Sequence, residues 1–394
     1  MNGDNIKIEK LKEYIQRLNN KEDGRKLYFE YKDEISSIKP QDAFRVFHGL
    51  LQDGMTEKEI LQFLDKTINV FHESLANHRW KRPENDNFLT DLQMENEALR
   101  KKTDYMKTIV REPRSQIRRE KLIPLIEELK EFYPHYTKKE NILFPYMEKK
   151  MPRFEGLAIM WALHDMVKNQ VQNALDKLRD SNSDDHQVNV AVAELFFGIL
   201  GIIKKEEIIL FPAACEVLSE QEWHEMHRQS YEYSFPFIEK TWDEEFLEAN
   251  EINEDTRIDG KFRTETGELD FIQMELIFDS LPVDMTFVDE NNKVRFFTRP
   301  KDRIFPRSPA IIGRDVNKCH PPDSVHIVEE IVEAFRKGER DTATFWIRIK
   351  DRMILIQYFA MRNDNGDYKG VLEVSQDITE IQALQGERRL LEWN

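Results

Sequence analysis

Apolar residues recur every three or four positions through most of the first 245 residues, which indicates a series of amphipathic helices. Residues 6–18 carry a single apolar stripe, as expected for a helix that packs on one face. Thr56 and Glu59 have the spacing of a capping box and mark the start of another helix. Together these patterns predict a small helical domain over residues 1–80.

Longer helical patterns follow, separated by prolines or short polar runs. They cover residues 88–110, 117–148, 154–180 and 187–216, and a further helix is expected over 219–245. Long helices with short connections are typical of a bundle, so we predict a four-helix bundle over residues 84–245. Its most apolar stretch, 188–210, contains several charged residues and is therefore interpreted as a buried helix and not as a membrane span.

The pattern changes near residue 250. Residues 246–268 are polar and aperiodic, which predicts a linker. Beyond them come short apolar runs with turn residues between them, as in antiparallel strands. These runs cover residues 285–289, 293–298, 342–349, 354–361 and 370–375, with helices expected at 269–280 and 324–338. We predict an antiparallel sheet with helices on one side over residues 269–394, ending in an amphipathic helix. The expected fold class is multidomain, α and α+β.

Composition narrows the possible functions. The chain has 394 residues, with 58 Lys and Arg against 74 Asp and Glu and a net charge of −16. This balance disfavours binding to nucleic acid, which needs a basic face, and to anionic lipid. Two cysteines are too few for a disulfide framework or a Cys-rich zinc site. Because the start is polar and has no signal-peptide core, we expect a cytoplasmic protein without membrane insertion.

An internal repeat in the bundle carries the candidate chemistry. The segment HYTKKENILFPYME begins at His135, and IIKKEEIILFPAACE begins at Ile202; their alignment superposes Glu140 on Glu207. Imidazole and carboxylate groups on facing bundle helices are typical ligands of iron. His164, on a third helix, is a further candidate ligand. Each copy ends in Phe-Pro, where the proline is expected to stop or kink the helix.

With these motifs the chain resembles the hemerythrin-like HHE cation-binding proteins over about residues 84–216. The resemblance implies four metal ligands: His135, Glu140, His164 and Glu207. It also implies histidines at two positions where this chain has Thr90 and Ile202. The two histidines and two glutamates that remain suffice for at most one iron or other divalent metal ion.

Two further resemblances flank the bundle. Residues 50–75 look like the domain of unknown function that often precedes HHE domains. Residues 269–390 resemble a PAS sensor domain in LPVDMTFVDENNKVRFFT, IFPRSPAIIGRDVNKCHPP and GVLEVSQDITEI. Such domains hold varied ligands in a small apolar pocket, so the resemblance leaves the ligand unknown. Cys319 and His320 are weak haem candidates, since either residue type serves as an axial ligand; a proline-set loop is the alternative.

The leading hypothesis is a cytoplasmic sensor or regulatory protein that couples a bundle with impaired metal ligation to a ligand-sensing PAS domain. It would act as a homodimer, or on a partner protein, through its C-terminal helix. The alternatives are a metal-binding protein of oxygen, nitric oxide or iron homeostasis, and an interaction scaffold with vestigial sites. The chain has none of the GxSxG, Walker A or GxGxxG motifs, so we expect no enzymatic activity.

Overall fold

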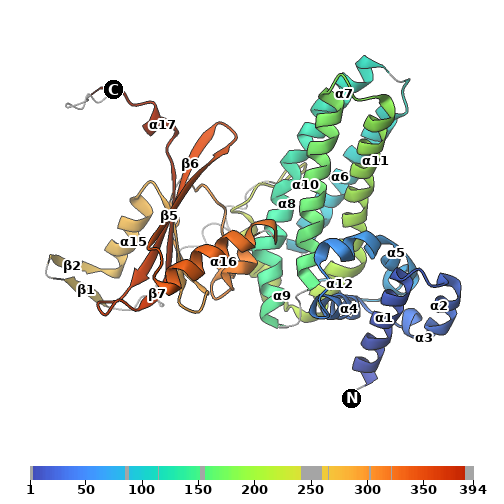
Figure 1. The fold of residues 1–394 in the computed structure, drawn as a ribbon, viewed down its shortest axis with the longest axis horizontal. Helices are drawn as coiled ribbons and strands as arrows, with labels where there is room; N and C mark the ends of the chain where they lie inside the picture. The colour runs from blue at the N-terminus through green and yellow to red at the C-terminus, as the bar shows by residue number, and fades with distance from the viewer. Residues whose placement is uncertain are drawn as a thin grey trace. The chain divides into compact units, whose positions relative to one another are not determined.

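The computed structural model describes residues 3–84, 88–113, 115–150, 156–240, 260–264, 266–300, 303–320 and 322–386. They belong to two compact units, Met1–Thr241 and Trp242–Asn394. The first unit is helical and the second is built around a sheet, which confirms the predicted fold class (Figure 1).

Five helices precede the bundle in the first unit. They are α1 (Gly3–Asn19), α2 (Gly24–Glu30), α3 (Lys32–Ser36), α4 (Pro40–Gln52) and α5 (Glu57–Ala76). The capping box predicted at the start of α5 is confirmed, because the Thr56 side chain accepts from the Glu59 amide and the Glu59 carboxylate accepts from the Thr56 amide. Gly54 ends the turn after α4 with φ +93°, a conformation that favours glycine.

The bundle consists of four long helical runs and one shorter helix. They are α6 (Phe88–Val110); the run α7 (Gln116–Glu128), η1 (Leu129–Phe132), α8 (Tyr133–Lys138), η2 (Lys139–Leu143) and α9 (Phe144–Lys150); α10 (Leu157–Arg179); the run α11 (Asp185–Lys205), η4 (Glu206–Leu210) and α12 (Phe211–Val217); and α13 (Glu220–Ser230). These bounds confirm the four predicted patterns. The fifth prediction was too long, since α13 ends at Ser230 and turns follow; Pro236 disfavours a helical conformation at Phe235.

A single hydrophobic core extends through the helical unit, from Ile8 in α1 to Tyr233 after α13. The N-terminal helices and the bundle therefore pack together instead of forming separate cores. Polar contacts add to this packing, since Lys205 pairs with Asp65 of α5 and Lys204 Nζ lies 2.9 Å from Asn69 Oδ1.

Both copies of the internal repeat contain a π-helical turn, η2 in the first and η4 in the second. Each turn lies directly before a Phe-Pro pair, and the helix continues past the proline to Lys150 or Val217 instead of stopping. In an α-helix the proline ring collides with the carbonyl four residues earlier. A π turn, with its i→i+5 spacing, widens the helix at that point, and such turns are frequent at functional sites.

Among the residues that the structure describes, one helical run, Asp185–Val217, has the length and composition of a membrane span. Half of its apolar window is buried within the helical unit, as is common for the core helix of a globular protein.

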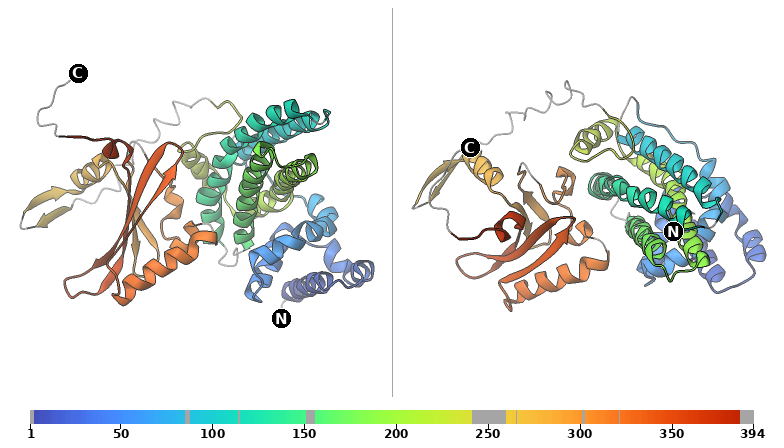
Figure 2. Two further views of the ribbon diagram at one scale, coloured as in Figure 1. Left: turned by 45° about the horizontal axis from the view of Figure 1, so that its top comes forward. Right: turned by 90° about the horizontal axis from the view of Figure 1, so that it is seen from above.

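The second unit contains a five-stranded antiparallel sheet in the order β4-β3-β7-β6-β5. Its strands are β3 (Asp284–Asp289), β4 (Val294–Phe297), β5 (Thr342–Ile349), β6 (Arg352–Arg362) and β7 (Tyr368–Asp377), and each corresponds to a predicted run. The helix α16 (Pro322–Lys337) covers one face of the sheet (Figure 2). Short 3-10 turns η6 (Pro309–Ile311) and η7 (Val316–Cys319) precede it.

A close backbone approach occurs where β7 pairs with β3. Gly370 adopts φ +137°, and a Cβ atom at this position would lie 2.1 Å from the carbonyl oxygen of Val288. Only glycine fits such a contact without displacing the neighbouring strand.

Of the segment expected to be a linker, 246–268, the structure describes residues 260–264 and 266–268. Its described end forms the hairpin β1 (Lys261–Thr264) and β2 (Gly267–Asp270), which Glu268 stabilises by pairing with Lys261 and Arg263. Alternation is weak in this charged hairpin, which explains why the pattern suggested a linker. The helix α15 (Phe271–Ser280) follows, with Asp270 as its N-cap.

The expected C-terminal helix is only partly within the described residues. The structure contains α17 (Thr379–Gln382), which ends before Gly386, and residues 387–394 lie outside the described part of the chain.

Candidate functional sites

The centre of the bundle holds a fully buried group of charged side chains. His135 of α8 lies between two carboxylates: its Nδ1 is 2.7 Å from Glu95 Oε2 of α6, and its Nε2 is 3.2 Å from Glu206 Oε2 of η4. None of the three side chains is exposed to solvent. His135 therefore bridges the two carboxylates through its two ring nitrogens.

Two lysines complete this group, and each pairs with one of the carboxylates. Lys138 contacts Glu95 and Lys139 contacts Glu206, and both ammonium groups are fully buried. The Lys138 ammonium also lies 4.2 Å from the ring centre of Phe235. The two ammonium charges therefore balance the two carboxylate charges inside the protein, as a buried ion requires.

The ion pair between Lys139 and Glu206 joins equivalent positions of the internal repeat. The two residues are 67 positions apart, and each is the first residue of its π turn. The two copies of the repeat therefore face each other at this point, and they differ there in charge. Burial disfavours an ionised Glu206, but the positive charges of Lys139 and His135 outweigh burial and hold the pKa of Glu206 well below its usual range.

A second buried pair lies close to this group. Glu140 Oε1 is 2.6 Å from His164 Nδ1, and Lys168 is 3.9 Å from the same oxygen. Burial and the charge of Lys139 lower the pKa of His164 well below its usual value, so its imidazole is neutral and Nδ1–H donates to Glu140. The other ring nitrogen, Nε2, is buried and has no hydrogen-bond partner among the described residues.

The predicted ligands are only partly brought together. His135, Glu140 and His164 are buried in the bundle, whereas Glu207 is 41% exposed and pairs with Arg100 at 2.6 Å. The adjacent Glu206 points inward instead. At the two positions where a histidine was implied, Ile202 is buried in the hydrophobic core and Thr90 is half-buried.

Four residues of the buried group were missed: Glu95, Lys138, Lys139 and Glu206. A signal for the lysines was present, because residues three and four positions after His135 share its helix face. For Glu206, no signal in the sequence shows that this residue, and not the adjacent Glu207, is the buried one.

A second ion group links α6 to α13 and to the residues that follow α13. Asp91 of α6 contacts Lys240 and lies 3.1 Å from His227 Nε2 of α13. His227 is only 6% exposed, because α13 packs against α6. Burial opposes ionisation of Asp91, but hydrogen bonds from His227 and Lys240 hold its pKa below the usual value.

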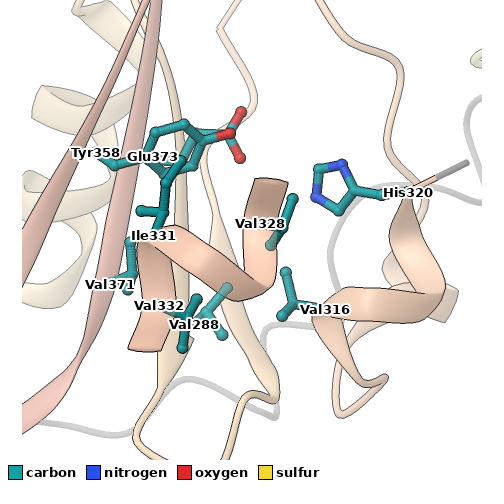
Figure 3. A pocket seen from close by; sticks show the side chains of 9 residues that line it. All are labelled: Val288, Val316, His320, Val328, Ile331, Val332, Tyr358, Val371 and Glu373. Atoms are coloured by element: carbon teal, nitrogen blue, oxygen red, sulfur yellow. The ribbon is translucent and has the colours of Figure 1, made fainter. Parts of the chain in front are cut away.

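The sheet unit contains a small pocket between α16 and the sheet (Figure 3). Its apolar wall comes from valines and one isoleucine, and its polar residues are His320, Tyr358 and Glu373. Of the two haem candidates, His320 lines the pocket and Cys319 does not. The Cys319 thiol lies 3.6 Å from the Asp315 carbonyl oxygen.

Models of known protein families match residues in both units. A model described as the hemerythrin HHE cation binding domain matches residues 87–214, and a PAS domain model matches residues 274–379. The chain contains a hemerythrin HHE domain and a PAS domain. A family of unknown function, DUF438, matches residues 11–77. These matches confirm the three resemblances seen in the sequence and support a sensor or regulatory role.

Solved structures of short chains are also similar to this chain. A C-terminal domain from Streptococcus mutans is 30% identical, with 32% of this chain and 98% of that chain covered and a TM-score of 0.31. A PAS domain from Colwellia psychrerythraea is 23% identical, with coverage of 28% and 97% and a TM-score of 0.23. A sensory box sensor histidine kinase from Vibrio cholerae is 11% identical, with coverage of 27% and 90% and a TM-score of 0.22. No curated protein matches the chain.

The family description of the HHE domain implies a bound cation, but the residues of this bundle do not fit one. Within the described ranges, no three His, Cys, Asp or Glu side chains are arranged to hold a metal ion. The closest approach to such a set is His135 with Glu95 and Glu206. Both ring nitrogens already contact carboxylates, and each carboxylate contacts an ammonium group. Metal ligands must be free and deprotonated, and buried ammonium groups repel a cation.

Proposed function

We propose that this protein is a cytoplasmic, non-enzymatic sensor or regulatory protein in which a ligand-binding PAS domain is the sensing module. Its HHE bundle serves as a metal-independent partner of that module. The observation that carries the proposal is the pairing of Lys138 and Lys139 with Glu95 and Glu206, because it puts protein cations on the carboxylates that a metal would need. Ligand binding would shift the population of PAS conformations and so change what the protein contacts.

Protein purified without added metal is expected to contain well under one equivalent of iron, manganese or zinc in elemental analysis. Added Zn²⁺ or Mn²⁺ is expected to leave the Tm of the helical unit unchanged, since a ligand stabilises only a state that it binds. One equivalent of metal that is retained through dialysis and lost in a His135→Ala variant would contradict the proposal.

A second candidate is a metal-binding protein of oxygen, nitric oxide or iron homeostasis. It is favoured by His164, whose Nε2 is buried without a partner beside Glu140 and therefore has a free lone pair. This candidate predicts that His164→Ala lowers the metal content as much as His135→Ala does. The scaffold alternative predicts that both variants leave metal content and function unchanged.

Signal output is proposed to occur through self-association that involves the C-terminal helix. Size-exclusion chromatography with light scattering on the full chain is expected to give a dimer, and removal of residues 379–394 is expected to give a monomer. A full chain that stays monomeric and captures no partner in pull-downs would remove the support for this mechanism.

A further inference from the structure

The PAS pocket has an apolar floor and a polar side. Val316, Val328, Val332 and Val371 form most of the floor, while His320, Tyr358 and Glu373 lie along the other side (Figure 3). The space enclosed between these side chains is small. The pocket therefore suits a compact molecule with an apolar body and a polar group at one end.

Two of the polar side chains have hydrogen-bonding capacity to spare. Neither the His320 imidazole nor the Tyr358 hydroxyl forms a hydrogen bond with any other residue in the described part of the chain. Burial raises the pKa of Tyr358 and lowers that of His320, so the phenol stays protonated and the imidazole neutral. Each group thus has one N–H or O–H to donate and a lone pair to accept with.

The charges beside the pocket are already balanced. Glu373 pairs with Arg307, whose terminal nitrogen lies 3.2 and 3.3 Å from the two carboxylate oxygens, and both side chains are mostly buried. With His320 neutral, the pocket offers no net counter-charge to a ligand. A charged group buried here would be left unpaired, which is strongly unfavourable.

We infer that the PAS pocket binds a small uncharged molecule with an apolar body and one hydroxyl or carbonyl oxygen, whose polar end hydrogen-bonds to Tyr358 and His320. The inference rests on the proposed sensor function and names the class of ligand for that site. It excludes haem, carboxylates and amines as the principal ligand.

Three probes that share a chain and differ in head-group charge test this inference: hexanone, hexanoate and hexylamine. In ligand-observed NMR on the full chain, hexanone is expected to bind at least tenfold more tightly than the other two. A Tyr358→Phe variant, which keeps the ring and loses the hydroxyl, is expected to bind hexanone about tenfold more weakly, the effect of one lost hydrogen bond. Val332→Phe fills the floor of the pocket and is expected to abolish binding.

The matched control is Tyr368→Phe. Its hydroxyl is buried, but it does not line the pocket, so this variant is expected to bind hexanone like the unchanged protein. Equal or tighter binding of hexanoate or hexylamine would overturn the inferred class while leaving a ligand-binding PAS domain intact. Binding that survives Val332→Phe would overturn the assignment to this pocket, and a Soret band in the purified protein would overturn it in favour of haem. Failure of all three probes would count against the proposed sensor function as well.

Discussion

A Lys139→Met variant is expected to lose about 3 to 5 kcal/mol of the free energy of unfolding of its helical unit, measured from urea denaturation followed by far-UV circular dichroism. Methionine has a similar length but no charge, so Glu206 would be left as a buried carboxylate with its main partner removed. Breaking one side of a buried ion pair costs far more than replacing the whole pair with apolar residues.

The control for this effect is a second substitution at the partner. Lys139→Met combined with Glu206→Leu removes both charges and is expected to recover most of the lost stability. Lys101→Met makes the same chemical change on a side chain that is 76% exposed and is expected to alter stability by less than about 0.5 kcal/mol. A Lys139→Met protein as stable as the Lys101→Met protein would show that Lys139 does not balance Glu206.

Gly370→Ala is expected to destabilise the PAS unit by about 3 kcal/mol while leaving the helical unit unchanged. Two effects add here: φ +137° is strained for alanine, and the new Cβ would lie 2.1 Å from the Val288 carbonyl oxygen, in the strand paired with β7. Differential scanning calorimetry should show a lower Tm only for the transition of the PAS unit.

Gly366→Ala separates the two effects. Gly366 also has a positive φ, +82°, but a Cβ there meets nothing within 4 Å, so the substitution is expected to cost only about 1 kcal/mol of backbone strain. Equal losses for the two variants would mean that the close approach of β7 to β3 contributes nothing.

The elements of this fold could be predicted where local signals and packing agree. The capping box at Thr56 and Glu59 and the apolar stripes of the bundle helices gave correct helices, because the face that repeats in the sequence is the face that is buried. The hairpin at 261–270 was missed because its strands are short and charged, so they show no alternation. The helix predicted over 219–245 was too long, although Pro236 is a local signal against a helix that continues through Phe235.

The candidate site was less predictable than the fold. The sequence singled out His135, Glu140 and His164 as candidate ligands, and all three are buried, as expected for polar residues of core helices that have partners. It pointed to Glu207 instead of Glu206, because the alignment superposes Glu207 on Glu140, whereas the glutamate of the second copy that is buried lies one position earlier. The roles of Lys138 and Lys139 depend on carboxylates from distant helices, and sequence spacing does not show which helices meet.

The pairing of Lys139 with Glu206 determines where the positive charge inside the bundle comes from. A positive charge that belongs to the polypeptide arrives with translation, in fixed stoichiometry, and cannot be withdrawn by a chelator, a competing protein or starvation for iron. A bundle built on that charge would keep its shape in a cell whose metal pools are empty, the condition under which bundles that depend on a captured ion lose theirs.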